Sequence, residues 1–260
     1  MALSLPPGLT HAEVSFLAEM EMVTVVPRQR LDSIDLLSGK TPALRPPHRA
    51  DLPLWLALLL KKQRRANIVP PPWLHPASLS QIVHRETKED PSAFSEPPPL
   101  PSRASSRHPG FASRQGEDGE FIVSPPFRAS CTADAPAGYL PYHWLEVAEA
   151  LLAYAGDDVA GLGSAGEIRG LLRDLVEVRA AKMRDSAGTL GAEGGGGVVS
   201  LRGVGALELA ENRGFVLGVV DGVRKIGASV EASRREEEME YEGAGGGGVG
   251  EDESDEDMGI

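Results

Sequence analysis

The 260-residue chain is long enough for one or two domains, but its 21 prolines and 30 glycines are concentrated in a few stretches, so only part of it can form a packed core. The net charge of −12 is also local, because eleven acids and no lysine or arginine lie between Glu236 and Asp257. The rest of the chain is close to neutral, which argues against sequence-independent DNA binding as its main task, since such binding needs a basic face.

Cysteine and histidine usage restricts the chemistry further. The single cysteine, Cys131, excludes an internal disulfide and a cysteine-based zinc site, and it fits a reducing intracellular compartment. The six histidines lack the spacing of a metal site, so we expect no metal and no cofactor. The first residues have no basic region of the kind found in secretory signals, and we expect the protein to work where it is made or in the nucleus.

The first fifty residues predict a small β-rich domain. Thr10 and Glu13 form a capping-box pattern that predicts a helix from about residue 11 to 20. The β-branched run from Met22 to Val26 predicts a strand that ends at Pro27, and residues 30–39 alternate more weakly. We assign residues 1–51 to this domain, which is too small to be comfortably stable alone.

Residues 52–74 read LPLWLALLLKKQRRANIVPPPWL, which predicts a short helix. Nine apolar or proline residues are too few to span a membrane. Asp51 is the expected cap, and the prolines at 70–72 forbid continuation. The helix is apolar on almost all sides, so we expect other parts of the protein to cover it on more than one side.

Four basic residues close to the end of this helix have two interpretations. They can complement the helix dipole as a solvated end, or they can contact phosphates in an independent nucleic-acid-binding module, which we keep as the alternative function. The four residues are Lys61, Lys62, Arg64 and Arg65.

A helical domain is predicted over residues 52–230, interrupted by a flexible insert. Ser78 and Gln81 form a capping-box pattern for a helix that stops before Pro91. Residues 91–138 contain nine prolines and eight serines that interrupt every periodic pattern. The arginine-serine stretch at 102–114 is a candidate for phosphorylation.

Helical periodicity returns after residue 139. A broad apolar face lies on Trp144, Val147, Ala148, Leu151, Leu152 and Ala155. Ser164 and Glu167 then predict the start of another helix, with Ile168, Leu171, Leu172, Leu175 and Val178 inside.

A last helix is expected from about residue 207 to 230. Its apolar positions include Phe215, Val219, Val223 and Ile226, and it carries Gly214, Gly218 and Gly222 at every fourth position. Either a neighbouring helix approaches these glycines closely, or the helix is weak and frays.

The final residues, 231–260, are predicted to form a disordered acidic tail. Ser254 precedes Asp255, Glu256 and Asp257, which makes it a candidate site for an acid-directed kinase such as casein kinase two.

None of the motifs in the sequence meets the requirements of a catalytic or nucleotide-binding site. GLGSAG at 161–166 matches the dinucleotide-binding pattern, but that chemistry needs a strand before the turn and the preceding segment is predicted to be helical. The glycine run at 194–197 lacks the lysine and hydroxyl residue of a phosphate loop. No nucleophile has a recognisable base, so the chain is predicted not to be an enzyme.

Three blocks together resemble the Psf-two subunit family of GINS, the eukaryotic DNA-replication complex. They are AEVSFLAEMEMVTVVPRQRLDSIDLLSG (12–39), the stretch at 52–74 quoted above, and PYHWLEVAEALLAYAGDDV continuing into EIRGLLRDLVEVRAAKMRDS (141–186). The second block is the most specific. The insert, the glycine run and the acidic tail depart from the compact family form.

The resemblance implies an α+β, mainly α fold: a small N-terminal β-rich domain followed by a helical-bundle domain. It also implies a non-catalytic structural subunit of a heterotetramer with the Sld-five, Psf-one and Psf-three subunits. In that family the tetramer joins the Cdc-forty-five protein and the Mcm ring as the CMG helicase, in the initiation and elongation of DNA replication. The expected location is then the nucleus.

Under this resemblance, sister subunits complete the apolar helix surfaces. We expect Trp55, Leu56, Leu59, Leu60 and Trp73 at the junction of the β-rich and helical domains. Candidates for intersubunit packing, with internal core as the alternative for each, are Leu171, Leu172, Leu175 and Arg179.

Overall fold

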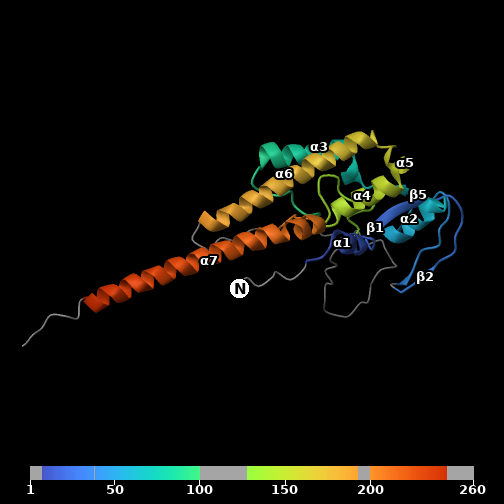
Figure 1. Cartoon of the computed structure of the whole chain (residues 1–260). Coiled ribbons are helices and arrows are strands. Elements are labelled where there is room, and N and C mark those ends of the chain that lie inside the picture. Colours follow the sequence, from blue (N-terminus) through green and yellow to red (C-terminus); the bar gives the residue numbers. More distant parts are fainter. Residues whose placement is uncertain (1–7, 38, 100–127, 193–199, 245–260) are drawn as a thin grey trace, which may run out of the picture.

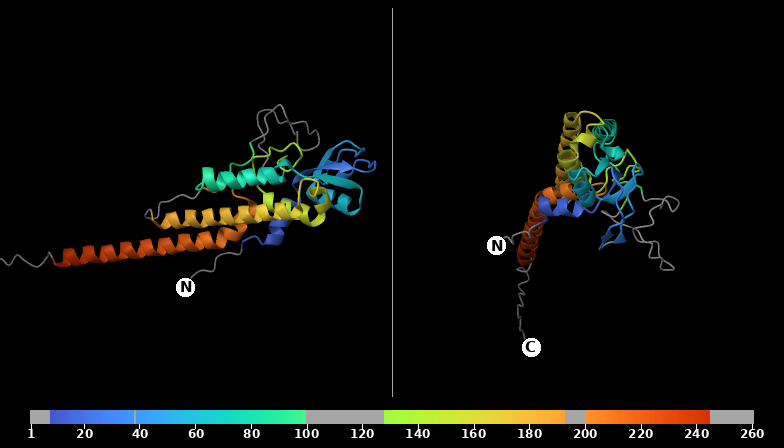
Figure 2. Two further views of the ribbon diagram at one scale, coloured as in Figure 1. Left: turned by 90° about the horizontal axis from the view of Figure 1, so that it is seen from above. Right: turned by 90° about the vertical axis from the view of Figure 1, so that its right-hand side faces the viewer.

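The computed structural model describes residues 8–37, 39–99, 128–192 and 200–244 (Figure 1). A small sheet unit lies at one end of the molecule, and three helices, α3, α6 and α7, run away from it side by side (Figure 2). The predicted fold class, mainly helical with a β-rich N-terminal part, is confirmed.

The sheet unit begins with a short capped helix, α1 (His11–Ala18). The Thr10 hydroxyl oxygen accepts a hydrogen bond from the Glu13 backbone, and the Glu13 carboxylate accepts one from the Thr10 backbone, so the predicted capping box is confirmed. The three-stranded antiparallel sheet has the order β4-β1-β5, with β1 (Met22–Pro27) in the centre, β4 (Ala50–Pro53) on one side and β5 (Ala66–Val69) on the other. A hairpin of β2 (Asp35–Leu36) and β3 (Gly39–Lys40) extends from this unit.

One face of the sheet is apolar and faces the core. Val23 pairs with Leu52 and Val25 with Ile68, and all four side chains are buried. Because side chains alternate along a strand, the opposite face carries Thr24, Val26 and their cross-strand partners. The apolar face is covered by α2 and joins one continuous core with the helical region.

Helix α2 (Leu54–Lys62) begins later than expected. Asp51 does not cap it, because Asp51 lies in β4 and accepts a hydrogen bond from the Thr24 hydroxyl. Strand β5 follows α2, so the sheet continues past the predicted domain boundary at residue 51 and α2 connects two of its strands. The division of the chain into separate folding units stays a prediction.

The helical region comprises η1 (Pro72–Leu74), α3 (Pro76–His84), η2 (Arg85–Glu89), α4 (Trp144–Tyr154), α5 (Gly156–Val159), α6 (Ala165–Ala192) and α7 (Ala206–Ala244). The predicted capping box of Ser78 and Gln81 is wrong. Helix α3 starts earlier, at Pro76, whose fixed φ and missing N–H suit the first turn. The predicted apolar face of α4 is confirmed, since all six residues assigned to it are buried.

The insert is better ordered at its ends than predicted. Ser95 on one side and Cys131 on the other are buried, and Cys131 forms an isolated β-bridge with Val23. Backbone pairing and burial therefore override the proline-rich and serine-rich composition at these positions. The arginine-serine stretch at 102–114 lies outside the described residues.

The acidic tail is also helical at its start. Helix α7 runs to Ala244, so residues 231–244, predicted to be disordered, form its last turns. Glutamate, alanine and arginine are good helix formers, and Arg234 pairs with Glu238 one turn away. Ser254 lies outside the described residues.

Candidate subunit interface and its supporting ion-pair network

Arg179 is the centre of a buried polar network that joins the helices of the bundle. Its guanidinium donates from Nε to Glu208 Oε1 (2.6 Å), from Nη1 to Glu86 Oε1 (2.6 Å) and from Nη2 to the Gly203 carbonyl (2.6 Å). These partners lie on α7, on η2 and in the loop before α7. The Arg179 side chain is only 1% exposed, and it connects α6 to two segments that are distant in sequence, η2 and the start of α7 with its preceding loop.

Lys182 extends the network by one helical turn. Its ammonium group donates to the Ala93 carbonyl (2.5 Å) and the Asp90 carbonyl (3.1 Å) and lies 3.4 Å from Glu86 Oε2. The Ser95 N–H donates to Glu86 Oε1, and the Gly205 N–H donates to Glu208 Oε2. Two bases and two acids therefore compensate one another inside the protein, as buried charges require.

The pKa values of this network follow from charge pairing. Burial alone would raise the pKa of Glu86, but the charge of Arg179, the Ser95 hydrogen bonds and Lys182 outweigh burial and hold that pKa below its usual range. Burial would lower the pKa of Arg179, and the contacts with Glu208 and Glu86 raise it instead. Glu86 and Arg179 therefore stay charged at neutral pH.

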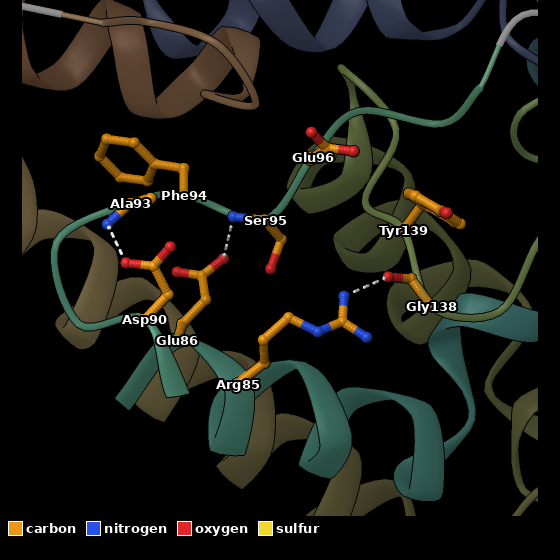
Figure 3. Close-up of a pocket in the computed structure, with 9 residues that line it drawn as sticks. All are labelled: Arg85, Glu86, Asp90, Ala93, Phe94, Ser95, Glu96, Gly138 and Tyr139. Carbon is orange, nitrogen blue, oxygen red and sulfur yellow. Dashed lines mark hydrogen bonds between the residues drawn. The ribbon is translucent and has the colours of Figure 1, made fainter. Parts of the chain in front are cut away.

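A cavity of about 290 Å³ lies beside this network (Figure 3). Two of its polar groups are bonded within the chain: Arg85 Nη1 donates to the Gly138 carbonyl, and the Asp90 carboxylate accepts from the Ala93 N–H. The Phe94 ring lies 4.9 Å from the Arg179 guanidinium carbon. The cavity walls thus attach residues 93–96 and 138 to the bundle.

Sequence reasoning identified Arg179 as either an interface residue or a core residue, and the structure buries it inside the chain. It missed Glu86, Lys182 and Glu208. A signal for Lys182 was present: Ile168, Leu172, Leu175, Arg179 and Lys182 fall at the three- and four-residue spacing of one helix face, and all are buried. Basic residues that continue an apolar stripe imply buried carboxylates nearby.

The other predicted apolar residues divide between core and surface. Leu56, Leu60 and Trp73 belong to the core that joins the sheet to the bundle, and Trp55 is half-buried against that core. Leu59 is 44% exposed and lies outside the junction. On α6, Leu172 and Leu175 are core residues, and Leu171 is half-buried.

The four residues predicted as phosphate contacts differ in burial and pairing. Lys61 lies 2.7 Å from Asp157 Oδ2 and 2.8 Å from Asp158 Oδ2, and its side chain is 9% exposed. This pairing removes Lys61 from the candidates for a phosphate contact. Lys62, Arg64 and Arg65 are exposed.

An exposed apolar stripe on α7 is the clearest candidate for a protein-binding surface. Phe215, Ile226 and Val230 are 45%, 66% and 62% exposed, and Val219 and Val223, which are half-buried, lie between them on the same side of the helix. We call these five residues the α7 stripe. Helix α7 runs beside α6 over its first part and then extends beyond the rest of the described chain (Figure 1), which leaves Ile226 and Val230 uncovered in the single chain.

The three glycines of α7 lie next to this stripe on the helix surface. Apart from the adjoining residues and the nearby backbone of α7 itself, no atom of the described residues comes within 4 Å of the position that a Cβ would take at Gly214, Gly218 or Gly222. The neighbouring helix that the glycine spacing suggests is therefore not supplied by the described part of this chain. A second exposed apolar site lies close to α7, because α1 packs on that helix and exposes Phe16 and Leu17.

The described residues show neither a metal centre nor a membrane span. They contain no group of three or more His, Cys, Asp or Glu side chains that could hold a metal ion. None of the helices within the described ranges is long and apolar enough to cross a membrane. GLGSAG spans the loop between α5 and α6 and the first two residues of α6, so a helix rather than a strand precedes it.

Two family models match the chain. Residues 10–69 match the PSF2 N-terminal domain, and residues 73–227 match the GINS complex protein helical bundle domain. The first match ends at the last residue of β5, and the second begins in η1. The second match contains the whole Arg179 network, and the α7 stripe continues past its end to Val230.

Curated relatives match over nearly the full length. The DNA replication complex GINS protein psf2 of Neurospora crassa is 68% identical over 254 residues, covering 92% of each chain. The corresponding protein of Gibberella zeae is 66% identical, covering 90% of this chain and 91% of its own length. That of Schizosaccharomyces pombe is 31% identical, covering 86% of this chain and 92% of its own length.

Proposed function

This chain belongs to the Psf2 family of GINS DNA replication complex proteins, and on that premise we propose that it is a non-catalytic structural subunit of a GINS heterotetramer. Its proposed partners in the tetramer are the Sld-five, Psf-one and Psf-three subunits. Through that tetramer it would act in the initiation and elongation of DNA replication, together with the Cdc45 protein and the Mcm ring of the CMG helicase. The proposed location is the nucleus.

The observation that carries this proposal is the α7 stripe. Large apolar side chains aligned on one face of a long helix are typical of a surface that another protein covers. Complete burial of a large apolar side chain stabilises a complex by about 1.5–3 kcal/mol, so the five residues together can contribute substantially. The open space at Gly214, Gly218 and Gly222 would let a partner helix approach closely.

The experiment that tests this role is substitution within the stripe. Ile226→Asp combined with Val230→Asp places two charges on the proposed interface, and an unpaired buried charge is strongly unfavourable. We expect co-purification with the other GINS subunits to fall by at least about tenfold, since tenfold corresponds to only 1.4 kcal/mol. The matched control is Ala228→Asp, an exposed position on the other side of α7.

Undiminished co-purification of the double variant would refute the assignment of the interface to the α7 stripe. Loss in the Ala228→Asp control as well would show that an aspartate anywhere on this helix disrupts it, which would equally remove the evidence for a specific surface. The far-ultraviolet circular dichroism of each variant reports whether α7 is intact.

A further inference from the structure

The sheet unit carries a concentrated positive charge that the neutral average of the chain conceals. Residues 28–65 contain nine lysines and arginines against three aspartates, a local net charge of +6. Two of these charges are neutralised, because Lys61 pairs with Asp157 and Asp158 and Lys40 pairs with Asp35. The remaining positive charge is mostly arginine.

Strand pairing brings these arginines together from four separate segments. The Arg28 N–H donates to the Arg65 carbonyl at the end of the β1–β5 ladder, so these two residues lie across from each other. Beyond the end of β1, Leu31 exchanges both backbone hydrogen bonds with Leu44, which places Arg30 opposite Arg45. Val25 pairs with Ala50, and the same register places Arg49 opposite Val26.

The alternation of strand residues assigns a common face to several of these arginines. Val26 pairs with Asn67, and Arg28 and Arg65 are each two residues further along their own strands. Arg28, Arg49 and Arg65 therefore lie on the face opposite the apolar core face. The hydrogen bond from Arg28 Nε to Asn67 Oδ1 (3.0 Å) confirms that the Arg28 side chain lies on that side.

We define the arginine cluster as Arg28, Arg30, Arg45, Arg49, Arg64 and Arg65. All six are exposed, and none forms an ion pair within the ranges that the structure describes. Of the nearby aspartates, Asp35 is engaged by Lys40 and Asp51 by Thr24, and Asp32 is exposed. Like charges directly opposite each other across strands are destabilising, so two such pairs lower the stability of the isolated sheet unit. An anionic partner would remove this repulsion.

The geometry points to the phosphate backbone of duplex DNA as that partner. We propose that the arginine cluster forms a sequence-independent duplex-binding surface at the end of the molecule opposite the far end of α7 (Figure 1). Arginine suits phosphate because its planar guanidinium donates two parallel hydrogen bonds. Residues 28–65 include no phenylalanine or tyrosine and one tryptophan, Trp55, which is half-buried, so the surface has few of the stacking platforms that single-stranded nucleic acid requires.

The test is salt-dependent binding of the purified GINS complex to a labelled 30-base-pair duplex, measured by fluorescence anisotropy. Each phosphate contact contributes about −0.9 to the slope of log affinity against log salt. The triple variant Arg28→Ala, Arg49→Ala, Arg65→Ala should make this slope less steep by about 2.7 and weaken binding at moderate salt by at least about tenfold. The charge-retaining variant Arg28→Lys, Arg49→Lys, Arg65→Lys should keep most of the slope.

Controls separate this surface from the rest of the complex. Arg173→Ala and Arg184→Ala remove exposed charges of α6 and should leave the slope within about 0.5 of wild type if the cluster dominates. Co-purification of the subunits should be intact in the triple variant, so a failure of this inference is distinct from a failure of the assembly role. The alanine variant should melt no lower than wild type, because it removes like-charge repulsion.

Three outcomes would overturn the inference. The first is duplex affinity and salt slope unchanged in the alanine variant. The second is tighter binding to 30-nucleotide polythymidine than to the duplex through the same arginines. The third is binding of an acidic peptide, EDESDEDM, through the cluster without any binding of duplex, which would assign the surface to an acidic protein segment.

Discussion

Arg179 illustrates how one side chain can organise a helical domain. It connects α6 to η2 and to α7, and its two carboxylate partners are buried with it. Removing a single partner from a buried ion pair is costly because it leaves the other charge without compensation.

We expect Arg179→Met to destabilise the bundle by about 3–5 kcal/mol, because Glu86 and Glu208 would each lose their main compensating charge. Hydrogen exchange of the assembled complex should show lost protection in peptides of α6 and of the start of α7. The matched control is Arg173→Met on the exposed side of α6, which should change stability by no more than about 0.5 kcal/mol. Equal protection in both variants would contradict the role given to Arg179.

Glu21 gives the stability of this protein a particular pH dependence. The residue is fully buried between α1 and β1, and burial raises its pKa to about 8. The Cys131 thiol opposes this shift and Glu146 adds to it. Neither Glu21 oxygen meets hydrogen-bond geometry with any described residue, and a thiol is only a weak donor, so burial dominates.

The sign of the effect follows from proton binding. The folded chain holds the Glu21 proton up to about pH 8, whereas the unfolded chain releases it near pH 4.5. Between these values the folded state binds more protons, so stability falls as the pH rises. Glu21→Gln should remove this decline and make the complex more stable than wild type at pH 8.

The measurement is the thermal midpoint of wild type and variant from pH 5 to pH 8.5. One pKa unit corresponds to about 1.4 kcal/mol, so the two profiles should diverge by several degrees across this window. Glu19→Gln is the control, because Glu19 is exposed and water solvates its charge. Parallel profiles for Glu21→Gln and wild type would show that Glu21 does not titrate in this range.

At the scale of elements, Asp158 connects the sheet to the helical bundle. Its Oδ2 accepts a hydrogen bond from the Ile68 N–H of β5 (2.7 Å) and lies 2.8 Å from Lys61 at the end of α2. Asp157 also pairs with Lys61, but its side chain is largely exposed. Adjacent residues on α5 thus offer a matched comparison.

Asp158→Ala should destabilise the contact of α5 with β5 by about 1–3 kcal/mol, because the buried Ile68 N–H would lose its partner. Asp157→Ala should cost at most about 1 kcal/mol, since it removes an exposed ion pair. Hydrogen exchange at Ile68 distinguishes the two variants. Faster exchange in Asp157→Ala than in Asp158→Ala would reverse the assignment.

Most elements could be predicted from the sequence because their signals are local. The capping box of α1, the β-branched run of β1 and the apolar face of α4 each depend on residues within a few positions of one another. The failures involve distant partners. Asp51 looks like a helix cap until Thr24 pairs with it, and Cys131 lies in a proline-rich context until Val23 bridges to it.

For the candidate sites too, local signals could be predicted from the sequence and contacts between distant residues could not. The apolar positions of the α7 stripe up to Ile226 are visible in the periodicity, but the exposure of each one depends on which distant elements pack on α7. The arginine cluster combines four segments through strand register, so the sequence suggested only its part at 61–65 and wrongly included Lys61. No local pattern could have revealed the carboxylates that enclose Arg179, because they lie on other helices.

At the scale of the whole molecule, the two ends differ in character. The sheet unit and its arginine cluster lie at one end, and the exposed α7 stripe extends along the helix toward the other (Figure 2). The core between them is continuous, which suits a rigid connector. A chain of this kind contributes surfaces to an assembly and leaves part of its own apolar surface uncovered when alone.

The central claim is that this chain reaches its working state only with its partners, and native mass spectrometry after co-expression with the Sld-five, Psf-one and Psf-three subunits tests it most directly. We predict a soluble assembly with one copy of each subunit, and aggregation or misfolding when the chain is expressed alone, because the α7 stripe would then be exposed. A stable, monodisperse monomer that ignores the three partners would contradict the account.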